Sequence, residues 1–363
     1  MSIPHTPNST GDLVADAVCF FREVIRPLAE AIDQSTAALG EGLRSLGHQG
    51  LLGLRIPREF GGRGLGEIEF RRFQEECARA SGCLAFLQTQ HQSAGAMLAK
   101  CESEELKIRH LPSMASGASL CGIAFSQLRR RSEKPVLSAK QVHGGYELTG
   151  DAPWLTGIGF FENCVTAATT EGGETMFVIH SLENGQNGLA FSQPMKLASM
   201  EPAQTVSARF VDYFVPSDQM LYVKPGNWIE NNDMINIALQ SPFALGCARA
   251  SLDVIEANFE KKALPAMGAA LEALRIELDH CRSEAYAAMD ARADTARSLA
   301  ARGWAVELAL RCSATAVVTS SGAGNSLKHP AQRIYREALV FAVSAQTADT
   351  MEATLSCLSR TSA

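Results

Sequence analysis

The residues best suited to chemistry in this 363-residue chain begin with Trp154, Thr156 and Gly157, which follow a predicted strand and turn. The indole could support a planar cofactor, and the hydroxyl could donate a hydrogen bond to a ring nitrogen. A Trp that only packs beside a turn is the alternative interpretation.

Two further motifs suggest contact with phosphate. Arg129, Arg130 and Arg131 form a basic run in a chain whose net charge is -6. Guanidinium groups match phosphate oxygens, so the run could clamp a phosphorylated ligand; a solvated loop is the alternative. Gly322 and Gly324 could let the backbone approach a phosphate before the next helix, or they could simply end the preceding helix.

His91 is the candidate acid or base. It lies among Gln88, Thr89, Gln90 and Gln92 in a predicted helix with almost no charge. Polar side chains inside a buried helix either have hydrogen-bond partners or face a cavity. A satisfied core histidine and a catalytic histidine therefore both remain open.

Composition excludes several classes of protein and site. The chain is 46% hydrophobic and acidic, which argues against nucleic acid or an anionic membrane surface as the main partner. It has no run of about 18 apolar residues and no signal-peptide pattern, so we expect no membrane span and a cytoplasmic location. The ten cysteines and eight histidines do not cluster, so we expect reduced thiols and no metal site.

Hydrophobic periodicity divides the chain into three predicted domains. Residues 1–118 have helical spacing, with helices starting near Gly66 and covering about 84–99. Residues 119–223 hold short strand-like runs between turns and no helical stretch, which predicts an antiparallel β-barrel or sandwich. Residues 224–363 return to helical spacing and predict a four-helix bundle. The fold class is therefore α+β.

Two details of the predicted bundle can be checked. The first bundle helix runs from Met234 through Phe259, and Pro242 should kink it. The last begins with Pro330 in its first turn.

Several strings in this order resemble the acyl-CoA dehydrogenases and their flavoprotein relatives. Residues 46–57 with 60–66 are similar to "LGxxGLxxxxIPxxxGGxGLG", and residues 150–157 to "GxKxWITN". Residues 207–216 are similar to the closing strand of the family's middle domain, and residues 330–338 to "PxxxxxRDA". The resemblance covers nearly the whole chain and implies an acyl-CoA dehydrogenase-like fold.

The resemblance also implies a flavin, FAD with FMN as the alternative, between the β domain and the bundle. It implies an acyl thioester as substrate and a homodimer or homotetramer. Trp154 and Thr156 take the places of the ring-stacking Trp and the hydroxyl near the flavin N5. Phe125, Ser126 and Ser132 lie in the segment that aligns with the "VTEPGAGSD" loop, and Gly322 and Gly324 match a Gly-rich turn that touches a neighbouring subunit's FAD.

Departures from the family concern the catalytic base. Ala345 stands where the family's Glu in "YEGT" removes the α-proton, and Asn236 stands at the alternative position on the first bundle helix. Neither side chain accepts a proton, and a positioned base supplies about 10²–10⁴-fold in rate. Glu337 and Asp349 are nearby carboxylates that do not align with either position. Arg129, Arg130 and Arg131 stand where the family's loop has Gly-Ala-Gly, and the "RxxFG" segment is replaced by residues 261–265.

Three functions follow as hypotheses. The first is a flavin-dependent oxidoreductase that acts on an acyl thioester, with its base unplaced. The second is a monooxygenase of the same fold that uses reduced flavin and His91. The third is a catalytically silent binding or assembly protein.

Overall fold

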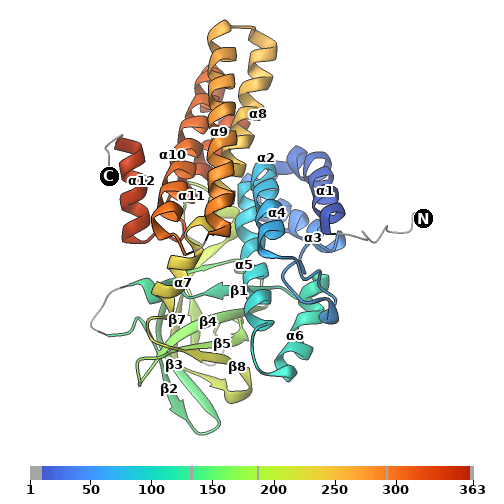
Figure 1. Cartoon of the computed structure of the whole chain (residues 1–363). Helices are drawn as coiled ribbons and strands as arrows, with labels where there is room; N and C mark the ends of the chain where they lie inside the picture. The colour runs from blue at the N-terminus through green and yellow to red at the C-terminus, as the bar shows by residue number, and fades with distance from the viewer. Residues whose placement is uncertain (1–9, 131–133, 186–187, 292, 360–363) are drawn as a thin grey trace, which may run out of the picture. The chain divides into compact units, whose positions relative to one another are not determined.

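The computed structural model describes residues 10–130, 134–185, 188–291 and 293–359 (Figure 1). They form two compact units. One comprises the described residues within 1–34, 65–85 and 235–363, and the other those within 35–64 and 86–234. The first unit is helical, and the second holds the sheet.

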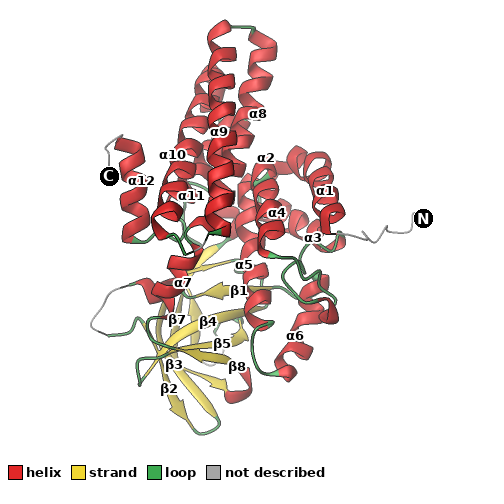
Figure 2. Cartoon of the chain, in the orientation of Figure 1, coloured by secondary structure: helices red, strands yellow, loops and turns green. Residues whose placement is uncertain are grey.

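The order of elements is helices, strands, helices, as predicted (Figure 2). The helices are α1 Thr10–Phe20, α2 Arg26–Gln34, α3 Thr36–His48, α4 Glu67–Ala80, α5 Gly82–Leu98, α6 Glu104–Ser116, α7 Trp228–Asn236, α8 Ser241–Lys262, α9 Pro265–Asp290, α10 Thr295–Thr319, α11 Pro330–Val343 and α12 Ala348–Ser359. The strands are β1 Cys121–Ala124, β2 Leu137–Val142, β3 Gly145–Thr156, β4 Asn163–Thr170, β5 Thr175–Ser181, β6 Leu189–Phe191, β7 Thr205–Pro216 and β8 Met220–Lys224. The two units interleave segments of all three predicted domains, so the boundaries at 118 and 223 stay a prediction.

The sheet is mixed, and the prediction of a purely antiparallel sheet is wrong in this respect. The strand order is β6-β7-β3-β2-β4-β5-β8, with β1 paired to β4 off this path. β1 and β2 both pair with β4 in parallel. Parallel strands need a crossover connection. The connection from β1 to β4 contains the β2–β3 hairpin in place of the usual α-helix. The sheet is not a closed barrel, since β6 and β8 are separate ends of the path.

A sandwich describes this unit well because its sheet packs on both faces. One core joins β3 and β7 to β4 and β5; its members include Leu148, Ala152, Phe210, Cys164, Met176 and Val178. A second core lies on the other face of β4 and β5 and includes Val165, Phe177, Ile179, Leu98, Leu106 and Met114. Strands buried on both faces have continuous rather than alternating apolar runs. This explains the unbroken hydrophobicity of β4 and β5.

The helical unit contains α8, α9, α10 and α11, which run side by side (Figure 1). The predicted single helix from Met234 through Phe259 is wrong. The chain instead ends α7 at Asn236, makes a 3-10 turn over Ala238–Gln240 and starts α8 at Ser241. Pro242 lies in the first turn of α8, where its missing N–H removes no helical hydrogen bond, so it begins a helix rather than bending one.

A buried carboxylate ties α4 to α8 and α9 in this unit. Glu75 has no exposed surface. Arg249 Nη1 donates to its Oε1 at 2.7 Å, Arg282 Nε donates to the same oxygen at 2.8 Å, and Tyr286 Oη donates to Oε2 at 2.8 Å. Both oxygens are therefore satisfied, as a buried charge requires.

Candidate functional site

Trp154 points out of the sandwich core because β3 carries a bulge. Between Ala152 and Leu155 the pairing of β3 with β7 shifts register, while both of these residues stay buried. A bulge inserts one extra residue and re-aims the side chains beside it. The indole of Trp154 is accordingly 48% exposed, so it does not simply fill the core.

Thr156 lies on the same face of β3 as Trp154, since side chains two residues apart in a strand point the same way. Its Oγ1 is 3.0 Å from Oγ1 of Thr205 on β7. One hydroxyl donates to the other, which leaves one hydroxyl hydrogen for an acceptor outside the pair. Thr205 could not be identified from the sequence. It lies beside Thr156 only through the pairing of β3 with β7, and the bulge sets the register of that pairing.

Ser126 and Gln127 present buried polar atoms that lack partners. They open the 3-10 turn Ser126–Arg129, which follows β1 and lies against β3. Among the described residues, Ser126 Oγ and Gln127 Oε1 have no hydrogen-bond partner. Buried polar atoms are nearly always satisfied, so these two atoms indicate a partner beyond the described residues, such as water or a ligand.

Phe125 precedes this turn and belongs to an aromatic cluster. Its ring meets Trp228 edge-on at 5.8 Å and Phe177 at 6.4 Å between centroids. Its side chain is thereby held in place, and it fixes the start of the turn that carries Ser126.

These groups fit a flavin. A half-exposed indole offers an aromatic face, the Thr156–Thr205 pair offers a hydroxyl hydrogen, and Ser126 offers a buried hydroxyl without a partner. All of them belong to the sheet unit.

The two described residues of the arginine run, Arg129 and Arg130, do not form a phosphate clamp. Arg129 donates from Nε and Nη2 to the two carboxylate oxygens of Asp233 on α7, at 2.7 and 2.6 Å. Arg130 is exposed. Arg131 and Ser132 lie outside the described residues. Arg129 therefore holds α7 to the loop instead of offering its bidentate edge to a ligand.

His91 occupies the core with both ring nitrogens bonded to the backbone. Cys121 N donates to Nδ1 at 3.1 Å, and Nε2 donates to Met114 O at 3.1 Å. Burial lowers the pKa of His91 to about 4. These contacts match the satisfied core histidine, and none of them supports the catalytic role, which stays a prediction.

Gly322 and Gly324 lie in the helical unit, in the 3-10 segment Ser321–Asn325 after α10. A Cβ on Gly324 would stand 2.7 Å from Val317 O, so packing on α10 requires this glycine. A Cβ on Gly322 would meet nothing within 4 Å. Packing therefore explains Gly324, and Gly322 leaves an open stretch of backbone.

The positions of the family's base lie where helices end. Ala345 has a φ of 47° in the connection between α11 and α12, and Asn236 is the last residue of α7. Glu337 is fully buried and accepts hydrogen bonds from Gly82 N and Arg333 Nη1. Burial raises the pKa of Glu337. Its contacts make it part of a structural ion pair.

In the part of the chain that the structure describes, no three His, Cys, Asp or Glu side chains are grouped to hold a metal ion. Over the same residues, no helix combines the length and the apolarity needed to cross a bilayer.

Sequence relatives point to one family. Residues 10–118 match the family model of the acyl-CoA dehydrogenase N-terminal domain. The chain is 29% identical over 249 residues to the mitochondrial isovaleryl-CoA dehydrogenase of Solanum tuberosum, an alignment that covers 65% of this chain and 60% of that protein. It is 24% identical over 353 residues to the probable acyl-CoA dehydrogenase YngJ of Bacillus subtilis (strain 168), which covers 91% of this chain and 92% of the relative.

Solved structures agree on the fold. The glutaryl-coenzyme A dehydrogenase in its glutaryl-CoA complex superposes with a TM-score of 0.83 at 21% identity, over 99% of this chain and 97% of the other. Butyryl-CoA dehydrogenase from Megasphaera elsdenii superposes with a TM-score of 0.80 at 19% identity, over 99% and 100%. The matched N-terminal domain and the relatives support an acyl-CoA dehydrogenase-like family for this chain, and the solved structures share its fold.

Proposed function

We propose that this protein binds a flavin, FAD with FMN as the alternative, on the Trp154 face of its sheet unit and acts as an oxidoreductase on an acyl thioester. The observation that carries the proposal is the buried hydroxyl of Ser126, which has no partner among the described residues and aligns with a flavin-contacting hydroxyl of the family. The relatives named as acyl-CoA dehydrogenases support the substrate class.

Each residue of the sheet unit has a distinct role in this proposal. The exposed indole of Trp154 stacks on the ring system and shields it from water. The Thr156 hydroxyl, held by Thr205, donates to a ring nitrogen, and Ser126 donates to a second acceptor. When bound, the flavin supplies a two-electron acceptor, which no side chain of the chain can replace.

The proposed oxidation has no identified base to remove the substrate's α-proton. Ala345 and Asn236 occupy the two positions where the family carries its base, so we expect turnover to be about 10²–10⁴-fold slower than a base at either position would allow. The same observation favours the second candidate, a protein that binds flavin or a thioester without turnover. Reduced-flavin monooxygenation by way of His91 has no contact in its favour, since both imidazole nitrogens are bonded to the backbone.

The test begins with the absorbance spectrum of the purified protein. We expect flavin bands that decrease when an acyl-CoA is added without oxygen. Trp154→Ala should reduce bound flavin, whereas Phe214→Ala, which removes a 43% exposed aromatic ring from the same sheet, should not. A spectrum that no acyl-CoA changes would favour the silent binding protein, and a protein that stays colourless after incubation with FAD and FMN would refute flavin binding.

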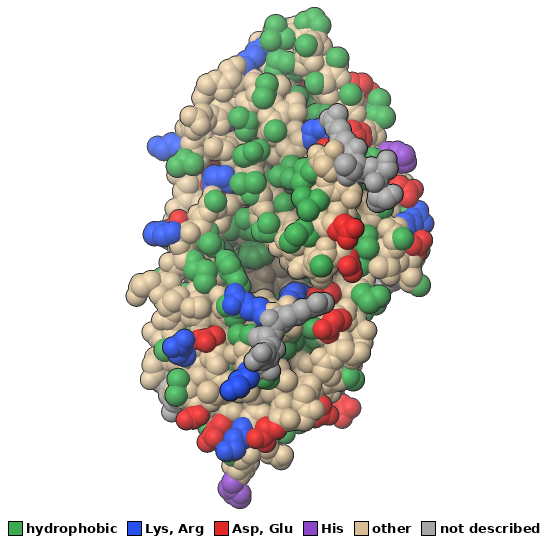
Figure 3. All heavy atoms as spheres, turned by 90° about the vertical axis from the view of Figure 1, so that its left-hand side faces the viewer, with side chains coloured by type: hydrophobic (Ala, Val, Ile, Leu, Met, Phe, Trp, Pro, Cys, Tyr) green, Lys and Arg blue, Asp and Glu red, His purple; other side chains and the backbone are tan. Residues whose placement is uncertain are grey.

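Self-association is also part of the proposal. Leu339, Val343, Met351, Leu355 and Leu358 on α11 and α12 are each at least 40% exposed. Figure 3, which views the side where α12 lies in Figure 1, shows hydrophobic side chains gathered over the helical part. Light scattering during size exclusion should give the mass of a dimer or tetramer; the mass of a single chain at micromolar concentration would contradict this.

A further inference from the structure

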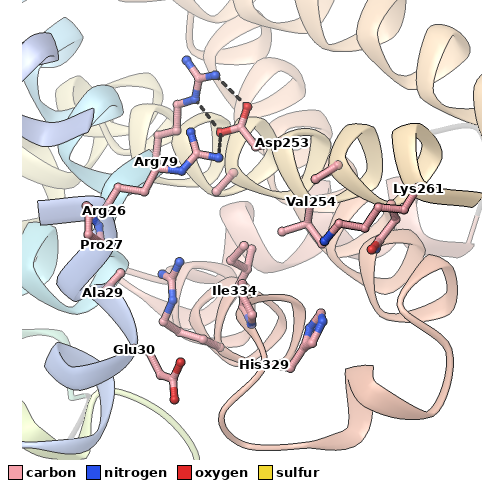
Figure 4. Close-up of a pocket in the computed structure, with 15 residues that line it drawn as sticks. Arg26, Pro27, Ala29, Glu30, Arg79, Asp253, Val254, Lys261, His329 and Ile334 are labelled. Atoms are coloured by element: carbon pink, nitrogen blue, oxygen red, sulfur yellow. Dashed lines mark hydrogen bonds and ion pairs between the residues drawn. The ribbon is translucent and has the colours of Figure 1, made fainter. Parts of the chain in front are cut away.

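A polar cavity of about 330 Å³ lies within the helical unit, apart from every residue assigned above to the flavin (Figure 4). Its walls come from α2, α4, the second half of α8 and the start of α11. The charged and titratable residues that line it are Arg26, Glu30, Arg79, Asp253, Lys261, His329 and Arg333. It is large enough for a small organic ligand, since such pockets begin near 300 Å³.

The cavity carries excess positive charge in an acidic protein. Asp253 accepts two hydrogen bonds from Arg79, at 2.7 and 3.0 Å, and pairs with Arg26 at 3.2 Å. One carboxylate therefore serves two guanidinium groups, which leaves one positive charge uncompensated. Arg333 is neutralised by Glu337 outside the lining.

Lys261 adds a further positive charge, so that Arg26, Arg79 and Lys261 stand against the two carboxylates of the lining, Asp253 and Glu30, and one positive charge is in excess. Lys261 has no hydrogen bond or ion pair with the described residues, and its side chain extends past Val254 into the cavity (Figure 4). Glu30 is the opposing charge of the lining, and its carboxylate points away from Lys261 and Asp253 (Figure 4).

Hydrogen-bond donors remain available on the same residues. Arg79 uses Nε and Nη2 on Asp253, so its Nη1 keeps its hydrogens, and Arg26 uses a single nitrogen. His329 caps α11 by accepting from Ala331 N at Nδ1, which places the proton of its neutral ring on Nε2. Arg26, Arg79, Lys261 and His329 therefore all have donors without acceptors among the described residues.

We propose that this cavity binds a small phosphate monoester. The excess positive charge and the free donors match a phosphate anion, which accepts several charge-assisted hydrogen bonds at once. The remaining lining includes Pro27, Ala29, Ala250, Val254, Ala257 and Ile334, which offer apolar surface to the organic part of the ligand. The site does not depend on the proposed flavin chemistry, because it shares no residue with it.

Isothermal titration of the full chain, as purified, with inorganic phosphate and with phenyl phosphate tests the proposal. We expect both to bind, phenyl phosphate about tenfold more tightly because it also buries apolar surface. Lys261→Gln and Arg26→Gln should each weaken binding about tenfold, which is the loss of one charge-assisted contact. No heat of binding from either anion at roughly 10 mM would overturn the proposal, because a dissociation constant above roughly 10 mM excludes even weak recognition.

Matched controls separate this site from general charge and from the flavin. Arg22→Gln removes an exposed arginine of the preceding turn, and Lys328→Gln removes an exposed lysine beside His329; neither lines the cavity, and neither should change binding. Equal losses in the control and cavity variants would overturn the proposal. Phosphate should bind equally to flavin-loaded and flavin-stripped protein, and its displacement by flavin would show that the titration reports the flavin site instead.

Discussion

His91 gives the sharpest prediction, because the structure places it in the core with both ring nitrogens bonded to the backbone. The proposed change is His91→Gln, which removes the titrating ring and keeps an amide that can donate to Met114 O and accept from Cys121 N. The variant isolates the contribution of one buried imidazole to the dependence of stability on pH.

The sign follows from the two pKa values of His91. Burial lowers the pKa in the folded protein to about 4, from an ordinary value of 6.5. Below pH 6.5 His91 is protonated in the unfolded chain but stays neutral in the folded protein. The free energy of unfolding therefore decreases as the pH falls, until about pH 4. Two pH units at about 1.36 kcal/mol each make this loss about 2.5 kcal/mol between pH 7 and pH 4.5.

Urea unfolding at both pH values measures the effect. Wild type should lose about 2.5 kcal/mol more than His91→Gln between pH 7 and pH 4.5. His143→Gln, which removes an exposed histidine from the turn between β2 and β3, should behave as wild type does. The difference between the two variants cancels other titrating groups.

Two results would refute this reasoning. Parallel losses of stability in wild type and His91→Gln would mean that His91 titrates normally and is not enclosed. A folded His91→Gln protein that keeps its flavin but loses all substrate-dependent activity at pH 7 would mean that His91 takes part in the chemistry.

Three further predictions concern stability, each read from urea unfolding at pH 7. Glu75→Gln should cost about 3 kcal/mol because it removes the buried carboxylate that accepts from Arg249, Arg282 and Tyr286, while Glu76→Gln should cost about 1 kcal/mol; equal costs would contradict the buried network. Gly157→Ala places a Cβ 2.2 Å from the Phe161 ring at a φ of 98°, so it should cost more than about 2 kcal/mol. Gly159→Ala, whose Cβ has open space, should cost about 1 kcal/mol. A smaller loss for Gly157→Ala than for Gly159→Ala would show that the turn rearranges. Arg129→Gln should cost about 1 kcal/mol through its contact with α7, and an unchanged stability would show that this pair is only a surface contact.

The order of elements could be predicted because hydrophobic spacing changes where the chain passes from helix to strand and back. β3, β4, β5 and β7 all lie within residues 119–223, where strand-like runs are predicted. The parallel pairing of β1 with β4 could not be predicted, because it joins residues about 40 positions apart through an intervening hairpin. Pro242 was misplaced because a proline in a helical pattern fits a kink and a helix start equally well.

The candidate site divides in the same way. Trp154 and Thr156 stand in a strand, where the side-chain period places both on one face. The bulge that exposes the indole leaves no mark in the pattern of residue types, and Thr205 is brought to Thr156 only by its register. The cavity around Asp253 draws residues from four helices, so no local motif announces it.

The central claim is that a flavin binds on the Trp154 face of the sheet unit. Heat release of the ligand from purified protein, followed by its identification by mass, tests this claim most directly. We expect FAD or FMN at about one per chain in wild type and in Phe214→Ala, and clearly less in Trp154→Ala, because the loss of one aromatic stacking contact weakens flavin binding by up to about tenfold. Wild-type protein that releases no flavin, even after incubation with both FAD and FMN, would contradict the account.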